Sequence, residues 1–284
     1  MLSITDADGV AFSSVGEALD AVRQGQVTGA VVPIENSVEG GGSATLDKLV
    51  DGDPLMITGE VVIPVEFGLY VRPGTSLGDV ASVLTHGHAA AQCRDWLATM
   101  IPSAQVTEAG STAGAAKEVS DPASRYDAAI CARVAGQLYE LEELAYSIED
   151  NPGAVTRFVV ASRPGRLPER TGADKTTLVA YLHQDHPGAL LEILQQFAVR
   201  GVNLCRIESR PTKTLLGSYC FAIDAEGHLT DRRLTETLLG LHRICRDVIF
   251  LGSYPRADAQ PPDVRRGFDD ESFEEAQAWL ERLA

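Results

Sequence analysis

Apolar residues in the first part of the chain follow two kinds of spacing. In residues 14–25 they recur at helical spacing behind a serine and a glutamate placed as in a capping box, which predicts a helix that ends at a glycine. A continuous apolar run at residues 30–34 predicts a buried strand, and residues 43–50 predict a short helix. Every second residue from 61 to 71 is apolar, which predicts one long strand that crosses between two lobes.

A second series of alternating patterns follows. Residues 88–100 predict a helix, residues 106–120 and 126–139 each predict a strand that leads into a helix, and residues 156–163 predict a further strand. The repeated order of strand and then helix is typical of α/β proteins with parallel sheets. Residues 163–174 are rich in proline, glycine and charge, which predicts a linker.

The pattern changes after this linker. Strands and helices are now expected in the order βαββαβ, which is a ferredoxin-like small domain. An irregular stretch and an amphipathic helix are expected at the C-terminal end. The predicted elements are strand 175–183, helix 187–200, strands 202–209 and 218–224, helix 231–243, strand 247–251 and the helix within 269–283.

The charge and composition of the chain argue against several classes of binding partner and location. The formal net charge of −16 argues against nucleic acid and against anionic membrane surfaces. The chain has no apolar run of about 18 residues, so no membrane span is expected. The N-terminus lacks the basic and apolar regions of a secretory signal. The widely spaced cysteines form no C-x-x-C pair, which favours reduced thiols in a cytoplasmic protein.

Polar residues follow the predicted strand at 30–34. Glu35, Asn36 and Ser37 come directly after it, and Gly40, Gly41 and Gly42 follow. Ordinary turn chemistry explains such a strand end. The alternative is a binding site, because open α/β sheets place their ligands at the carboxyl ends of strands. An anionic ligand would then need local arginines and backbone N–H groups to overcome the acidic charge of the whole chain.

Three stretches in a fixed order carry a family resemblance. VPIENSVEGGGSATLD, IEDNPGAVTRFVV and HPGALLEILQQFAVRGVNLCRIESRP resemble the P-I-E-N-S and Thr-Arg-Phe motifs of prephenate dehydratases and the G-A-L and E-S-R-P motifs of their ACT regulatory domain. LGSYP resembles the end of that domain. The resemblance implies a two-lobed α/β catalytic domain like type 2 periplasmic binding proteins, followed by the ferredoxin-like ACT domain. It also implies a hydro-lyase that converts prephenate to phenylpyruvate in phenylalanine biosynthesis, under feedback control by phenylalanine.

The resemblance sets the expected domain boundaries. Residues 1–165 form the catalytic domain, with lobe I at about 1–66 and 155–165 and lobe II at about 67–154. Residues 174–255 form the ACT domain, and 256–284 form a tail with a helix. Family members open with a strand and a Gly-Pro-x-Gly-Thr-Phe loop, and nothing similar precedes VAFSSVGEALDAV here. An asparagine common before the Thr-Arg-Phe motif is also replaced, since Gly153, Ala154 and Val155 precede Thr156.

The implied reaction needs no metal and no redox cofactor. Prephenate is a dianion that becomes aromatic on losing CO2 and hydroxide, so the main requirement is a donor at the leaving oxygen. Thr156 is the candidate donor, and its alternative role is β propensity at a strand start. Arg157 pairs with a substrate carboxylate or fixes the loop, unless it is a surface arginine. Phe158 contacts substrate or belongs to the core.

Further candidates stand at the predicted ends of strands and helices. Ser37 and Asn36 would donate to the anion or cap a turn, and Glu35 would orient its neighbours. Ser111 and Thr112 begin a helix, where free N–H groups bind anions, although simple N-capping explains them equally. His86 lines the cleft or lies in an exposed loop.

The ACT resemblance adds an effector site for L-phenylalanine and a side-by-side homodimer or homotetramer. Its residues are Gly188, Ala189, Leu190, Asn203, Leu204, Glu208, Ser209 and Arg210. Three other functions stay open. The chain would be an arogenate dehydratase if it accepts the amine in place of the keto group, or a non-catalytic amino-acid sensor, because a fold does not fix a function. A transcription regulator would need a basic helix-turn-helix, which the sequence lacks.

Overall fold

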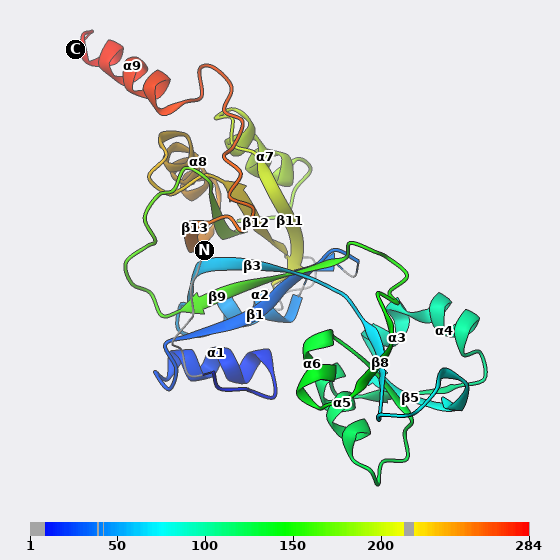
Figure 1. Ribbon diagram of the computed structural model, residues 1–284. Helices are drawn as coiled ribbons and strands as arrows, with labels where there is room; N and C mark the ends of the chain where they lie inside the picture. The colour runs from blue at the N-terminus through cyan, green and yellow to red at the C-terminus, as the bar shows by residue number, and fades with distance from the viewer. Residues whose placement is uncertain (1–8, 39, 42, 213–218, 284) are drawn as a thin grey trace. The chain divides into compact units, whose positions relative to one another are not determined.

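The computed structural model describes residues 9–38, 40–41, 43–212 and 219–283 (Figure 1). The chain divides into two compact units. Unit 1 comprises Met1–Val62 and Arg157–Ala284, and unit 2 comprises Ile63–Thr156. Each unit has an α/β organisation of its own, so the predicted fold class is confirmed.

The first sheet of unit 1 has the strand order β2-β1-β9-β3. The chain leaves this sheet along β3 and returns to it along β9, so two separate segments of the chain form the sheet. The first helix begins as predicted, because Ser14 Oγ accepts from the Glu17 N–H, while the Glu17 carboxylate accepts from Ser13. The elements are α1 (Val15–Arg23), β1 (Gly29–Asn36), β2 (Gly40–Gly41), α2 (Ser43–Val50), β3 (Met56–Pro64) and β9 (Val155–Ser162).

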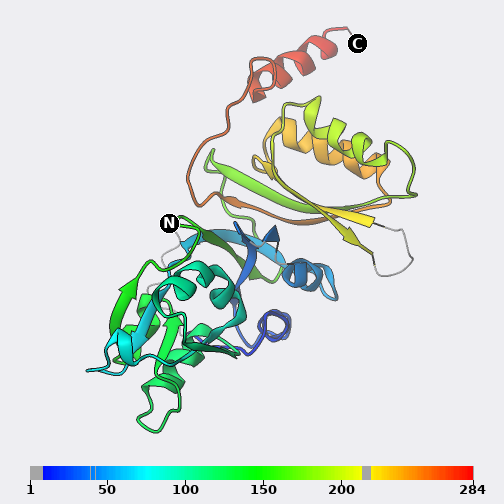
Figure 2. The same cartoon turned by 90° about the vertical axis from the view of Figure 1, so that its right-hand side faces the viewer.

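The second sheet of unit 1 has the order β11-β12-β10-β13, in which β10 runs antiparallel to β12 and β13, and β11 runs antiparallel to β12. Helices α7 and α8, yellow-green and orange in Figure 2, lie on the same side of this sheet. The βαββαβ prediction is therefore confirmed, except that Ser218 lies outside the described residues. The elements are β10 (Asp174–Tyr181), α7 (Ala189–Ala198), β11 (Leu204–Pro211), β12 (Tyr219–Glu226), α8 (Arg232–Ile244) and β13 (Asp247–Pro255).

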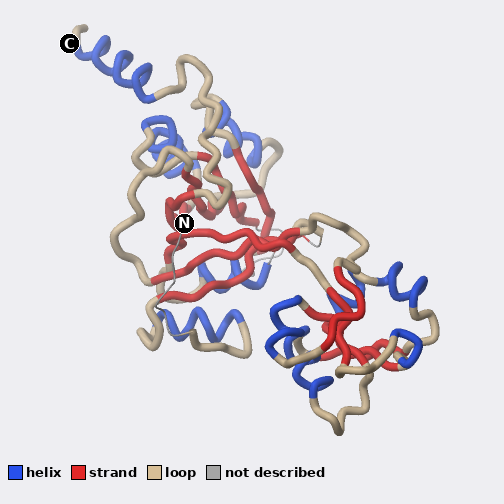
Figure 3. The backbone as a smooth tube through the Cα atoms, viewed as in Figure 1, coloured by secondary structure: helices blue, strands red, loops and turns tan. Residues whose placement is uncertain are grey.

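The two sheets of unit 1 share one hydrophobic core. Val159 of β9 belongs to the same buried cluster as Val179 of β10, Ala222 of β12 and Leu251 of β13. Alternate residues of the second sheet point to the opposite face and pack beneath α7 and α8. Strands β10 and β12 are therefore buried on both faces, between the helices and the first sheet, whereas β11 is exposed on one face. The linker before β10 has neither helix nor strand (Figure 3), and the C-terminal helix α9 spans Asp270–Glu281.

A close approach between the two sheets makes Gly252 a sensitive position. Its φ is +134°, and a Cβ atom would lie 2.1 Å from the carbonyl oxygen of Ile57 in β3. Gly252→Ala is expected to lower the free energy of unfolding by about 3 kcal/mol or more, because strain and overpacking add. Urea denaturation measures this loss in the free energy of unfolding. Gly172→Ala is the control, since Gly172 also has a positive φ but nothing within 4 Å of the added atom; equal losses in both variants would contradict the close contact.

Unit 2 contains a mixed sheet with the order β6-β5-β7-β4-β8. β5 runs parallel to β6 and β7, whereas β4 runs antiparallel to β7 and β8. The strands are β4 (Gly68–Val71), β5 (Ser82–His86), β6 (Gln105–Ala109), β7 (Ala128–Cys131) and β8 (Glu142–Tyr146), and the helices are η1 (Leu77–Asp79), α3 (Gly87–Gln92), α4 (Arg94–Met100), α5 (Thr112–Ser120) and α6 (Arg133–Leu138).

Two sequence predictions in this region are wrong. The long strand at 61–71 is two strands in different sheets, β3 and β4, and β4 is buried throughout rather than on one face. The helix at 88–100 is broken at Cys93, because the carboxylate of Asp150 accepts from the N–H groups of Asp95 and Trp96 and so caps a new helix. Strand β8 was not predicted.

The described part of the chain bears on the expectations about membrane spans and cysteines. No helix in that part has the length and apolar character needed to cross a membrane. The cysteines are free, and all are buried except Cys205. Burial raises the pKa of Cys93 and Cys131 to about 12, so these thiols stay protonated and unreactive at neutral pH.

Candidate active site

The Thr-Arg-Phe motif starts strand β9. Thr156 and Phe158 are half-buried there, and Arg157 between them is only 7% exposed. The Arg157 guanidinium lies 3.1 Å from Glu35 through Nη1, 3.4 Å from Glu60 through Nε and 2.5 Å from Asp224 through Nη2. Arg157 is therefore not a surface arginine. Because three carboxylates of this chain pair with the Arg157 guanidinium, the geometry supports the role of fixing the strand start.

The partners of Arg157 are themselves tightly held. Glu60 in β3 also binds the ammonium group of Lys175 at 2.9 Å and accepts from the Ala257 N–H. Asp224 in β12 is fully buried. Burial would raise the pKa of Asp224, but the nearby charges of Arg157 and Arg206 outweigh it and hold that pKa well below its usual range. Asp224 is therefore ionised at neutral pH.

The end of β1 supplies the next candidates. Glu35 orients Arg157, as expected of a structural carboxylate. Asn36 is the last residue of the strand, and its Oδ1 accepts from the Val38 N–H at 2.8 Å, which is turn capping. Ser37 lies exposed in the following turn. Of the predicted glycine-rich turn, Gly42 lies outside the described residues.

In unit 2 the fold brings His86 and the Ser111 region to one sheet edge. His86 ends β5 and is paired in parallel register with Ala109, two residues before Ser111. Ser111 caps α5 by accepting from the Gly114 N–H at 2.9 Å, and Thr112 is the first residue of that helix. His86 Nδ1 accepts from the His88 N–H at 3.3 Å, and the two rings stack. Ser111 also lines a pocket of about 590 Å³.

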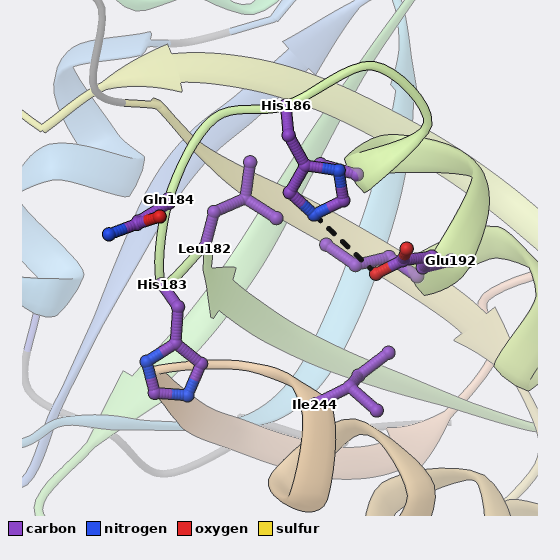
Figure 4. A pocket seen from close by; sticks show the side chains of 8 residues that line it. Leu182, His183, Gln184, His186, Glu192 and Ile244 are labelled. Carbon is purple, nitrogen blue, oxygen red and sulfur yellow. Dashed lines mark ion pairs between the residues drawn. The ribbon is translucent and has the colours of Figure 1, made fainter.

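A second pocket, of about 240 Å³, lies where β10 leads into α7 (Figure 4). Gly188 precedes α7 with a φ of +95°, and Ala189 is buried at the wall of the pocket. The side chains of His186 and Glu192 point toward each other, with Nε2 and Oε2 3.7 Å apart. The pocket is lined by Leu182, His183, Gln184, His186, Ala189, Glu192, Ile193 and Ile244.

Strand β11 carries the E-S-R-P motif, and its side chains divide between two faces. Glu208 and Arg210 lie on the face toward the first sheet, because Arg210 pairs with Asp47 of α2 at 2.8 Å. Ser209 lies on the opposite face and is exposed. Arg210 is opposite Cys220, which is opposite Tyr181, so this end of β11 shares an edge with the strand that leads into the pocket.

The remaining predicted effector residues lie elsewhere. Leu190 is in the first turn of α7 and partly exposed. Asn203 and Leu204 lie at the opposite end of β11 from Arg210, so within this chain the fold does not bring them to the pocket. A strand of eight residues separates its ends by about 25 Å.

Sequence reasoning missed the buried charges and most of the pocket. Lys175 and Asp224 stand in strands that are buried on both sides, and Glu60 stands in the buried first half of β3. A charged residue within such a segment is the signal that could have found them. His183, His186 and Glu192 follow a strand end and start a helix, but no spacing rule distinguishes them from loop residues.

Known proteins resemble this chain closely. The prephenate dehydratase family (PDT) matches residues 1–166. A prephenate dehydratase of Mycolicibacterium vanbaalenii is 46% identical over 96% of this chain and 85% of its own length. A prephenate dehydratase of Arthrobacter aurescens, solved in complex with L-Phe, is 51% identical, with a TM-score of 0.93 over 100% of this chain and 93% of that one.

A further solved structure is similar to this chain. GqqA, described as a novel type of quorum quenching acylase, is 30% identical, with a TM-score of 0.78 over 89% of this chain and 91% of that one. With its motifs, fold and relatives in agreement, this chain belongs to the prephenate dehydratase family and is an enzyme of the hydro-lyase class.

Proposed function

We propose that the enzyme converts prephenate to phenylpyruvate with Thr156 as hydrogen-bond donor to the leaving hydroxyl. The observation that carries this role is the anchoring of Arg157 by Glu35, Glu60 and Asp224. Thr156 directly precedes Arg157 in β9, so the same anchors limit its movement. A threonine hydroxyl is a weak acid, and its contribution is a hydrogen bond that strengthens as charge develops on the departing oxygen.

The carboxylates of prephenate are bound by neutral donors in this proposal. Arg157 is engaged by carboxylates of the chain, so it serves the site by holding β9 in place. In unit 1 the proposed donors are the side chains and N–H groups at the end of β1. In unit 2 they are those at the end of β5 and the start of α5. Phe158, half-buried in β9, supplies an apolar contact for the ring. The proposed binding residues are Asn36, Ser37, His86, Ser111, Thr112 and Phe158.

The pocket beside α7 is the proposed effector site for L-phenylalanine. Gly188 and Leu190 would direct N–H groups at the carboxylate of the amino acid. Ala189, whose own N–H donates to the His186 carbonyl, would line the pocket. Glu192 is placed to meet its ammonium group, and Ile193 and Ile244 give apolar walls. The L-Phe complex of the Arthrobacter aurescens relative supports this choice of ligand. The proposal includes pairing of two copies along β11, and a cytoplasmic location.

Activity measurements with prephenate and arogenate, and binding measurements with phenylalanine, test these assignments. Purified enzyme is mixed with prephenate, and phenylpyruvate is followed by its absorbance in alkali. We expect turnover of prephenate and a lower rate with arogenate, whose product is phenylalanine and is measured by chromatography. We also expect inhibition by phenylalanine, whose binding calorimetry should detect. Binding of phenylalanine without turnover of either substrate would identify a sensor instead, and a higher kcat/KM for arogenate would identify an arogenate dehydratase.

A further inference from the structure

Asp224 joins two arginines through one buried carboxylate oxygen. Its Oδ2 lies 2.5 Å from Arg157 Nη2 and accepts from Arg206 Nε at 3.0 Å. Its Oδ1 accepts from the Thr177 hydroxyl at 2.7 Å. Asp224 is fully buried and belongs to β12 of the second sheet, whereas Arg157 belongs to β9 of the first sheet. A residue of the C-terminal sheet therefore holds the arginine of the Thr-Arg-Phe motif.

The second arginine extends this contact to the edge of the sheet. Arg206 in β11 also pairs with Glu208 at 2.9 Å, and both side chains lie on the face toward the first sheet. Positive and negative groups thus alternate from Arg157 through Asp224 and Arg206 to Glu208. Each guanidinium is held in more than one direction, which fixes its orientation better than a single ion pair would.

The negative charge of Asp224 is what allows the two guanidinium groups to approach the same oxygen. With a neutral group in its place, Arg157 and Arg206 would repel each other in a buried environment, where such forces are little screened. Arg157 would then move toward Glu35 and Glu60. Because Thr156 is the preceding residue, its hydroxyl would move as well.

We propose that Asp224 is a positioning residue for the dehydration reaction, which acts by holding Arg157 and thereby the Thr156 hydroxyl. This inference rests on the proposed role of Thr156. It assigns to the C-terminal sheet a direct part in the geometry of the reacting strand. A residue of this kind should affect kcat more than KM, because it aligns the donor without touching the substrate.

Two pairs of side chains of equal size, Asp and Asn or Glu and Gln at position 224, test whether the negative charge of Asp224 is required for activity. Asp224→Asn is expected to lower kcat by about 10- to 100-fold, the effect of a small misplacement of a catalytic group, with KM within about twofold. Asp224→Glu should be more active than Asp224→Gln, because they differ in charge and not in size. Asp258→Asn is the matched control, since Asp258 pairs with Arg256 at the surface, and its kcat should be unchanged. Wild-type kcat in folded Asp224→Asn, or equal activity of the Glu and Gln variants, would overturn the proposal.

A double-mutant cycle separates this proposal from the role of Thr156. In a Thr156→Ala background, Asp224→Asn should cost less than about threefold in kcat, because the group that it positions is already gone. Full additivity would show that Asp224 does not act through Thr156. Wild-type activity of Thr156→Ala alone would instead refute the proposed donor.

A milder pair of variants covers the case in which changes at Asp224 prevent folding. Thr177→Val removes the hydrogen bond to Asp224, together with the one to the Tyr254 hydroxyl, but keeps the charge of Asp224, and should lower kcat by about threefold. Thr177→Ser keeps the hydroxyl and should stay close to wild type. Circular dichroism and thermal unfolding confirm the folded fraction in each case, and equal kcat values for the two folded Thr177 variants would count against the proposal.

Discussion

Thr156→Ala is expected to lower kcat for prephenate by about 100- to 1000-fold, the usual effect of removing one donor from developing negative charge. KM should change little, because the hydrogen bond becomes strong only as the hydroxide leaves. The folded state should be retained, since Thr156 is half-buried at the start of β9 and its neighbour Arg157 keeps its anchors. Steady-state kinetics with prephenate, followed through phenylpyruvate formation, measure both constants.

Isosteric variants show whether the hydroxyl itself is responsible. Thr156→Val keeps the shape and loses the donor, so it should be as slow as Thr156→Ala. Thr156→Ser keeps the donor and should retain most of the activity. Thr58→Val, on the neighbouring strand β3, removes a hydroxyl that donates to Val160, and should leave kcat unchanged. A Thr156→Val enzyme with the kcat of the wild type would exclude Thr156 as the donor.

Arg157→Met is expected to lower the free energy of unfolding by about 3 to 5 kcal/mol, because it leaves buried carboxylates without their partner. Glu60 keeps Lys175, but Asp224 would keep only Arg206 as a charged neighbour among the ion pairs of the described residues. Arg157→Lys should recover only part of the loss, because an ammonium group cannot reach carboxylates in three directions as a planar guanidinium does. Urea denaturation at neutral pH gives the free energies.

Arg166 provides the matched control for this measurement. It pairs with Glu169 at 3.0 Å, and both side chains are 85% exposed. Arg166→Met should change the free energy of unfolding by less than about 1 kcal/mol, because solvent screens an exposed ion pair. If Arg157→Met cost no more than Arg166→Met, the buried cluster would contribute nothing to the stability of unit 1, and fixing of β9 by Arg157 would lose its support.

Local sequence patterns were sufficient for most elements and for the order of the motifs. The cap at Ser14, the linker before β10 and the βαββαβ order are encoded by neighbouring residues, whose spacing follows the helical or strand repeat. For the same reason the sequence identified His86 and Ser111 as residues at strand and helix ends. It also placed Thr156 and Arg157 at the start of a strand.

Only the tertiary structure decided which partners these residues have. Arg157 is separated from Glu35 by 122 positions and from Asp224 by 67, and no local spacing records a contact over such distances. The break between β3 and β4 was hidden for a similar reason, since alternation continues while the chain passes from one sheet to another. The sequence thus determined the elements, the family and the motif residues, because each depends on neighbours in the chain. The fold alone decided that Arg157 anchors β9 and that a carboxylate of the C-terminal sheet holds it, because buried charges are stable only where distant segments bring opposite charges together.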